Sequence, residues 1–134
     1  MNDIAKRQEM IDQGQAFFDA NEYAIALAFF QRAQELGNTD ASVECSIGDC
    51  LYFTSTSGDI DKDGKPMVIV DDMNGLEMAI THIGRALHQS KASTRFLTSM
   101  VRALTVKSRW LENLLADQSD ENLNLQRDIE KLRG

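Results

Sequence analysis

The sequence predicts an all-α fold, and three observations support this prediction. The chain of 134 residues contains a single proline, Pro66, so few of its segments are barred from a helix. Alanine, leucine, glutamine and glutamate are abundant, and all four are strong helix formers. Apolar residues also recur at helical spacing along most of the chain. With 43% hydrophobic and 26% charged residues, we expect a single domain, residues 1–134, around one modest core.

The stretch from Gly14 to Ala33 predicts a hairpin of two helices, over about residues 3–19 and 22–37. Small residues let the two helix backbones approach closely, and aromatic residues fill the space beside them. The small residues are Gly14, Ala26 and Ala33, and the aromatic residues are Phe17, Tyr23 and Phe30.

The same spacing recurs later in the chain. Gly48 lies 34 residues after Gly14, on a helix expected over about residues 41–53. A further helix, expected over about residues 72–89, carries Leu76, Ala79, Ile83 and Ala86. Their mutual spacing is that of Tyr23, Ala26, Phe30 and Ala33. The second unit therefore carries 19 extra residues between its helices.

This pattern resembles the tetratricopeptide repeat (TPR), a helical hairpin with a period of about 34 residues. The resemblance implies antiparallel helical hairpins, with a first repeat over about residues 7–40 and a second over about 41–92, interrupted by an insertion at about 56–72. The C-terminal helices, over about 93–134, are expected to seal the last repeat. One of them should follow Ser93 and Thr94, and a final one should be capped by Ser119 or Asp120.

The insertion predicts a β-hairpin. Asp63 and Gly64 form the strongest two-residue turn signal in the chain, between Ile60 and the β-prone run of residues 67–70. Because a two-stranded ribbon is marginal by itself, we expect it to lie on the helices.

The insertion also resembles the start of an EF-hand calcium loop, in which Asp59, Asp61 and Asp63 would supply oxygen ligands ahead of Gly64. Val70 stands where the bidentate glutamate of that loop is due. Two interpretations stay open. The segment is either an acidic hairpin without a metal or the loop, residues 59–71, of a calcium-responsive regulator.

Composition and charge disfavour several partners. A net charge of −7 argues against nucleic acid, because proteins that bind it usually carry a basic face. No apolar stretch is long enough for membrane insertion, and the N-terminus shows no signal peptide. Cys45 and Cys50 lack metal-ligand spacing and are expected to be reduced thiols, which indicates a cytoplasmic location.

Catalytic motifs are missing from the sequence. It contains no glycine-rich phosphate loop, no nucleophile elbow and no zinc-protease motif. His82 and His88 have no serine, cysteine or aspartate at a recurrent catalytic spacing. We therefore expect neither an enzyme nor a cofactor.

The TPR resemblance implies a concave groove, lined by the first and third helices, that binds an extended peptide or a helix. The residues expected to face it are Ile11, Gln15, Phe18, Asp19, Cys45, Asp49, Tyr52 and Phe53. This surface is apolar and aromatic with two carboxylates, which favours an apolar or basic-apolar segment as the ligand. It lacks the Lys, Asn and Arg with which TPR clamps hold a C-terminal carboxylate. The alternative is that the aromatic residues are core, covered by the hairpin or the last helix.

These features predict a non-catalytic protein–protein interaction module, an adaptor or small chaperone with a protein or peptide partner. Its length, acidity and apolar groove are similar to those of the TPR-type chaperones of bacterial secretion systems. The alternative is a self-assembling structural subunit that forms a homodimer through its C-terminal helix. Trp110, flanked by Lys107 and Arg109, belongs either to the core or to a partner-binding surface.

Overall fold

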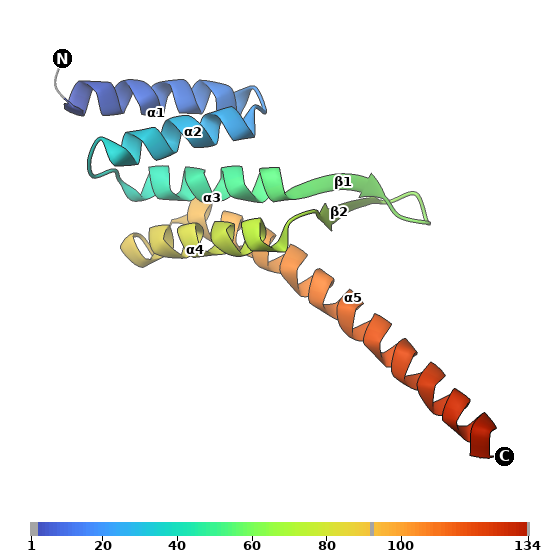
Figure 1. Ribbon diagram of the computed structural model, residues 1–134. Helices are drawn as coiled ribbons and strands as arrows, with labels where there is room; N and C mark the ends of the chain where they lie inside the picture. The colour runs from blue at the N-terminus through green and yellow to red at the C-terminus, as the bar shows by residue number, and fades with distance from the viewer. Residues whose placement is uncertain (1–2, 92, 134) are drawn as a thin grey trace.

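The protein is predominantly helical, as a computed structural model that describes residues 3–91 and 93–133 shows (Figure 1). Within these residues, five helices and one two-stranded sheet follow in the order α1, α2, α3, β1, β2, α4 and α5. The predicted all-α class with a small β insertion is confirmed.

The first hairpin consists of α1 (Asp3–Asp19) and α2 (Tyr23–Glu35). Asn21, in the turn between them, has a φ of 63°, a conformation that asparagine tolerates better than most residues. The two helices approach closely at Gly14, where an added Cβ would lie 2.8 Å from the ring of Phe30. The glycine therefore determines how near α2 can come to α1.

The second hairpin consists of α3 (Ala41–Ser55) and α4 (Met73–Gln89). Asp40 caps α3, because its carboxylate accepts the N–H of Val43 at 3.2 Å. An added Cβ on Gly48 would lie 2.5 Å from Cγ1 of Ile83. Gly14 meets Phe30 as Gly48 meets Ile83, so the 34-residue spacing corresponds to a repeated packing contact.

The core lies along α3, the most deeply buried helix. Fully buried Ile47 and Cys50 of α3 pack with Phe30 of α2 and with Leu76 and Ile83 of α4. The alanines of the predicted packing code are completely buried as well, namely Ala26, Ala33, Ala79 and Ala86. Small residues therefore occupy the helix contacts where the spacing predicts them.

The insertion forms the predicted hairpin, with β1 (Thr56–Ile60) antiparallel to β2 (Pro66–Val70). Gly64 adopts a φ of 78° in the turn. The carboxylate of Asp61 accepts the N–H groups of Asp63 and Lys65, both at 2.9 Å. The turn is thus stabilised by its own aspartate.

The expectation that this ribbon lies on the helices holds only at its base, where Val70 of β2 packs against the core. β1 continues directly from α3, and the hairpin projects beyond the helices (Figure 1). The carbonyl oxygen of Ser55 accepts the N–H groups of Asp71 and Asp72, which joins the two strands at the base. Ile60 near the tip remains 65% exposed, so the hairpin contributes little to the core.

The C-terminal segment forms one helix, α5 (Thr94–Arg133), and the predicted break at Ser119 or Asp120 is wrong. Neither glycine nor proline occurs between Thr94 and Arg133, and serine and aspartate are tolerated within a helix. Four residues of the first half are buried against the rest of the fold, namely Phe96, Ser99, Ala103 and Val106. Every residue from Ser108 to Arg133 is exposed, and this part of α5 projects away from the other helices (Figure 1). Only the first half of α5 therefore seals the second hairpin.

Candidate functional site

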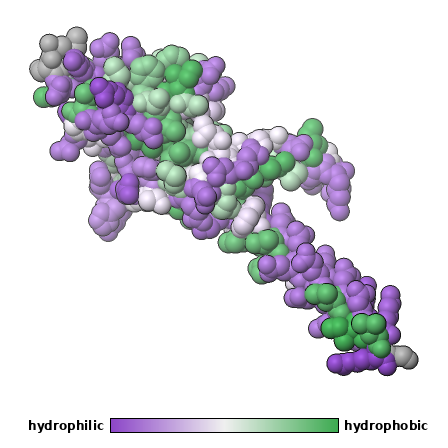
Figure 2. All heavy atoms as spheres, viewed as in Figure 1, coloured by the Kyte–Doolittle hydropathy of each residue, from purple (hydrophilic) through white to green (hydrophobic). Residues whose placement is uncertain are grey.

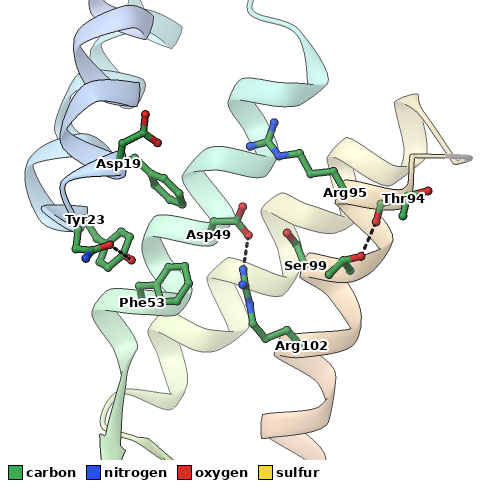
Figure 3. Close-up of a pocket in the computed structure, with 11 residues that line it drawn as sticks. Asp19, Tyr23, Asp49, Phe53, Thr94, Arg95, Ser99 and Arg102 are labelled. Atoms are coloured by element: carbon green, nitrogen blue, oxygen red, sulfur yellow. Dashed lines mark hydrogen bonds and ion pairs between the residues drawn. The ribbon is translucent and has the colours of Figure 1, made fainter.

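A pocket with a volume of about 520 Å³ lies between α1, α3 and the first turns of α5 (Figure 3). Phe18 and Asp19 at the end of α1 line one side, next to Tyr23 at the start of α2. Asp49 and Phe53, one turn apart on α3, lie in the middle. A short turn holds these side chains together, because only three residues separate the end of α1 at Asp19 from the start of α2 at Tyr23.

Three aromatic rings form the apolar part of this pocket. Tyr23 and Phe53 stack with their ring centroids 4.4 Å apart. Phe18 forms T-shaped pairs with both rings, with centroid distances of 5.2 Å to Tyr23 and 6.2 Å to Phe53. Aromatic surface of this kind contributes much of the binding energy at protein interfaces when a partner covers it.

The opposite side of the pocket is polar and comes from α5. Its lining residues there are Thr94, Arg95, Thr98, Ser99 and Arg102. The guanidinium of Arg102 donates to the carboxylate of Asp49 at 3.0 Å. It also lies over the rings of Tyr52 and Phe53, 4.8 and 4.7 Å from their centroids. Arg102 thereby connects α5 to α3 through both an ion pair and cation–π contacts.

The charges around the pocket balance. Asp49 pairs with Arg102, whereas Arg95 donates to the hydroxyl of Ser46 at 2.8 Å. The carboxylate of Asp19 accepts from the amide of Gln15 at 2.9 Å. The pocket thus combines two carboxylates and two guanidinium groups around an aromatic surface.

Four of the eight residues expected to face a groove line this pocket, namely Phe18, Asp19, Asp49 and Phe53. Ile11 is half-buried and packs against the core. Gln15 is exposed and reaches the pocket only through its hydrogen bond to Asp19.

Cys45 and Tyr52 are core residues rather than groove residues, with exposures of 0% and 4%. The physical reason is α5, whose Ser99 lies 3.7 Å from the Cys45 sulfur and whose Arg102 covers Tyr52. Burial raises the pKa of the Cys45 thiol and that of the Tyr52 hydroxyl. The core interpretation of the aromatic residues therefore holds for Tyr52, whereas Phe18 and Phe53 stay half-buried at the pocket.

The contribution of α5 to the pocket was missed from the sequence, although a signal for it exists. The 34-residue period and the 19-residue insertion together give a shift of 53 residues. This shift places Thr98 where Cys45 stands and Arg102 where Asp49 stands. It would have identified α5 as a third helix equivalent to α1 and α3.

The acidic insertion does not assemble its aspartates around a common point. Asp61 accepts two backbone N–H groups of the turn, and Asp59 accepts the N–H of Ile60 at 2.8 Å. Among the residues that the structure describes, no cluster of three His, Cys, Asp or Glu side chains could hold a metal ion. The carboxylates of Asp59 and Asp61 instead stabilise the local backbone.

His82 forms part of a polar cluster that joins α2, α3 and α4. Its Nδ1 lies 2.8 Å from the carboxylate of Glu44, which also accepts from Gln34 at 2.6 Å and from Arg85 at 3.5 Å. Burial alone would raise the pKa of Glu44, but hydrogen bonds from Gln34, His82 and Arg85 hold it below its ordinary value. His88 is exposed at the end of α4.

Trp110 follows Val106, the last buried residue of α5, and is 36% exposed. It is therefore not part of the core.

No protein-family model matches the chain, and no curated protein matches it. No helix in residues 3–91 or 93–133 has the length and apolar content that crossing a membrane requires.

Proposed function

We propose that the protein is a non-catalytic interaction module, an adaptor or small chaperone, that binds an apolar segment of a partner protein in the pocket between α1, α3 and α5. The observation that carries this proposal is the half-buried aromatic surface of Phe18, Tyr23 and Phe53 inside a concave site. Apolar segments bind such sites through buried anchor side chains.

The charges of the pocket refine the expected ligand. Arg102 is already paired with Asp49, and Arg95 brings in a second positive charge that the sequence interpretation did not include. Because the charges balance, the ligand is selected by its apolar side chains rather than by a net charge. Binding should therefore depend only weakly on ionic strength.

The test is selection of a phage-displayed random peptide library on the full chain, followed by titration of the enriched peptides. Asp19→Trp blocks the pocket, because Asp19 lines it and is exposed at the end of α1. Asp12→Trp is the matched control, since Asp12 is also exposed on α1 and also accepts from a glutamine four residues earlier.

The proposal expects apolar peptides that bind the wild-type chain and Asp12→Trp equally, and Asp19→Trp much more weakly. Peptides that bind all three proteins alike would contradict it, as would a selection that enriches no sequence.

A second candidate function is self-assembly through the C-terminal helix. The observation that favours it is the row of large apolar side chains exposed on the projecting half of α5, including Leu111, Leu115, Leu125 and Ile129. Figure 2 shows apolar residues along this part of the molecule.

A further inference from the structure

The exposed apolar residues of α5 follow a regular pattern of alternating three- and four-residue steps. At one set of positions, which correspond to d in the heptad abcdefg, stand Leu97, Leu104, Leu111, Gln118, Leu125 and Leu132. At the other set, the a positions, stand Val101, Ser108, Leu115, Asn122 and Ile129. We call these two sets together the α5 seam. All its residues are exposed, so the chain itself leaves the seam uncovered.

The beginning of the seam is the face of α5 that corresponds to the hairpin contacts of α1 and α3. The shifts of 34 and 53 residues relate Gly14 to Gly48 and Gly48 to Val101. Gly14 meets Phe30 of α2, and Gly48 meets Ile83 of α4. Val101 is 62% exposed, because none of the described helices follows α5 to pack on it. The equivalent face is therefore covered by a helix in both hairpins and uncovered in α5.

The residue types of the seam indicate what covers it. Branched Val101 and Ile129 at a positions, with leucine at five of the six d positions, favour a parallel two-stranded coiled coil. Asn122 at an a position is the kind of polar residue that fixes register and strand number in such dimers. We propose that the seam pairs, in parallel and in register, with the seam of a second copy of this chain. This proposal rests on the self-assembly candidate and specifies its interface.

Parallel pairing in register is the arrangement that satisfies the polar positions. Ser108, Gln118 and Asn122 each then meet their own equivalents, and leucine meets leucine. One antiparallel register of the seam places Asn122 against Leu111 and Gln118 against Leu115. Antiparallel registers shifted by one heptad bring Glu112 or Glu121 against its own equivalent, which is repulsive.

The charges beside the seam agree with the parallel arrangement. In parallel coiled coils, a residue at g faces the residue at e five positions later in the other helix. Asp128 of one copy thereby faces Arg133 of the second copy, and Lys107 faces Glu112. Lys107 also contacts Glu77 of its own α4 at 2.8 Å. Within the described residues, neither Asp128 nor Arg133 forms such an intrachain ion pair. No g–e pair between the two copies joins like charges.

The seam extends over the whole of α5, and the rest of the fold leaves it accessible. A helix of 40 residues is about 60 Å long. Leu97, Val101 and Leu104 are exposed even where α5 packs on the other helices. Arg95 and Arg102, which line the pocket, lie on another side of α5, because successive residues are about 100° apart around a helix. The dimer therefore leaves the guanidinium side of the pocket free, whereas Thr94 and Thr98 of the pocket lie beside the start of the seam.

Sedimentation equilibrium of the full chain over a wide concentration range tests the proposal. The expected mass is twice that of the 15.0 kDa chain. Leu125→Glu should raise the dimer dissociation constant by at least about 100-fold, because two leucines leave the interface and two like charges meet. Leu123→Glu is the matched control. Leu123 is 52% exposed, close to the 59% of Leu125, but lies off the seam and should leave the dimer unchanged.

The orientation is tested by Leu132→Cys with oxidised glutathione as the oxidant. Cys45 and Cys50 are fully buried, so the introduced thiol is the accessible one. Parallel pairing brings the two introduced thiols together and predicts a disulfide-linked dimer. Leu123→Cys, whose thiol lies off the seam, should form far less disulfide-linked dimer.

These outcomes distinguish a failure of the proposed interface from a failure of self-assembly itself. A monomer at all concentrations overturns both self-assembly and the proposed pairing. A dimer that tolerates Leu125→Glu leaves self-assembly standing and overturns the seam. A dimer that responds to Leu125→Glu but does not cross-link through Leu132→Cys overturns the parallel arrangement.

Discussion

Substitution of Gly48 tests the close helix packing that the repeated spacing predicts. In an open helix position, Gly→Ala stabilises a protein by about 1 kcal/mol through helix propensity. At Gly48 the new Cβ would lie 2.5 Å from Cγ1 of Ile83 and 3.0 Å from the backbone oxygen of Ala79. The backbone of α4 can yield only if the two helices separate, and overpacking of this kind costs about 1–3 kcal/mol. With an overpacking cost of about 3 kcal/mol and a gain of about 1 kcal/mol from helix propensity, we expect Gly48→Ala to lower the free energy of unfolding by about 2 kcal/mol.

Gly84→Ala is the matched control, because it lies inside α4 and meets only Cε of Met100 at 3.7 Å. It should stabilise the protein by up to about 1 kcal/mol. The assay is urea unfolding followed by far-ultraviolet circular dichroism at one fixed protein concentration. Close packing at Gly48 is contradicted if Gly48→Ala is as stable as the wild type, or if the two variants shift the unfolding midpoint in the same direction.

Three further predictions concern the polar and thiol groups of the fold. Arg102→Ala should destabilise the protein by about 2 kcal/mol in urea unfolding, because Asp49 is buried and loses its ion-pair partner. The double variant that also carries Asp49→Ala should regain part of the lost stability, and a double variant that regains none would argue against the pair. Burial alone would raise the pKa of Glu44, but its hydrogen bonds hold this pKa below the ordinary 4.5. The ionised form of Glu44 therefore stabilises the fold above about pH 4.5, and this stabilisation is lost as the pH falls through the lower pKa of the folded state. The stability difference between wild type and Glu44→Gln should therefore shrink on acidification, and a difference that grows instead would contradict the linkage. Cys45 and Cys50 should not react with Ellman's reagent in the native protein, since both are fully buried and burial raises the pKa of Cys50 to about 12; rapid reaction without urea would show that this part of the core opens.

The helical hairpins could be predicted because their signal is local and repeated. Gly14 and Gly48 are 34 residues apart, and each lies where a large side chain of the next helix needs the space. The hairpin turn was equally visible, since Asp63 and Gly64 are residues that a tight turn requires.

The continuity of α5 could not be predicted from capping signals alone. Ser119 and Asp120 are good N-cap residues, but a cap acts only where the preceding residues leave the helix, and no glycine or proline makes them do so. Dividing the segment into two helices also concealed the seam, because its regular steps run across the supposed break from Leu115 to Leu125.

The pocket was only half predicted, because its second side depends on tertiary packing. Phe18 and Phe53 were placed by the repeat spacing, whereas Arg95 and Arg102 reach the site through the docking of α5. That docking also buries Cys45 and Tyr52, which the same spacing assigned to the surface.

The most direct test of the proposed function is an amide chemical-shift titration of the isotope-labelled full chain with the best apolar peptide from the library selection. Binding in the pocket predicts shifts that saturate with one peptide per chain and centre on Phe18, Phe53 and Thr98. It predicts none in the projecting part of α5, from Ser108 onward. Shifts confined to that part of α5, or no shifts at saturating peptide, would contradict the assignment of the pocket between α1, α3 and α5 as the binding site.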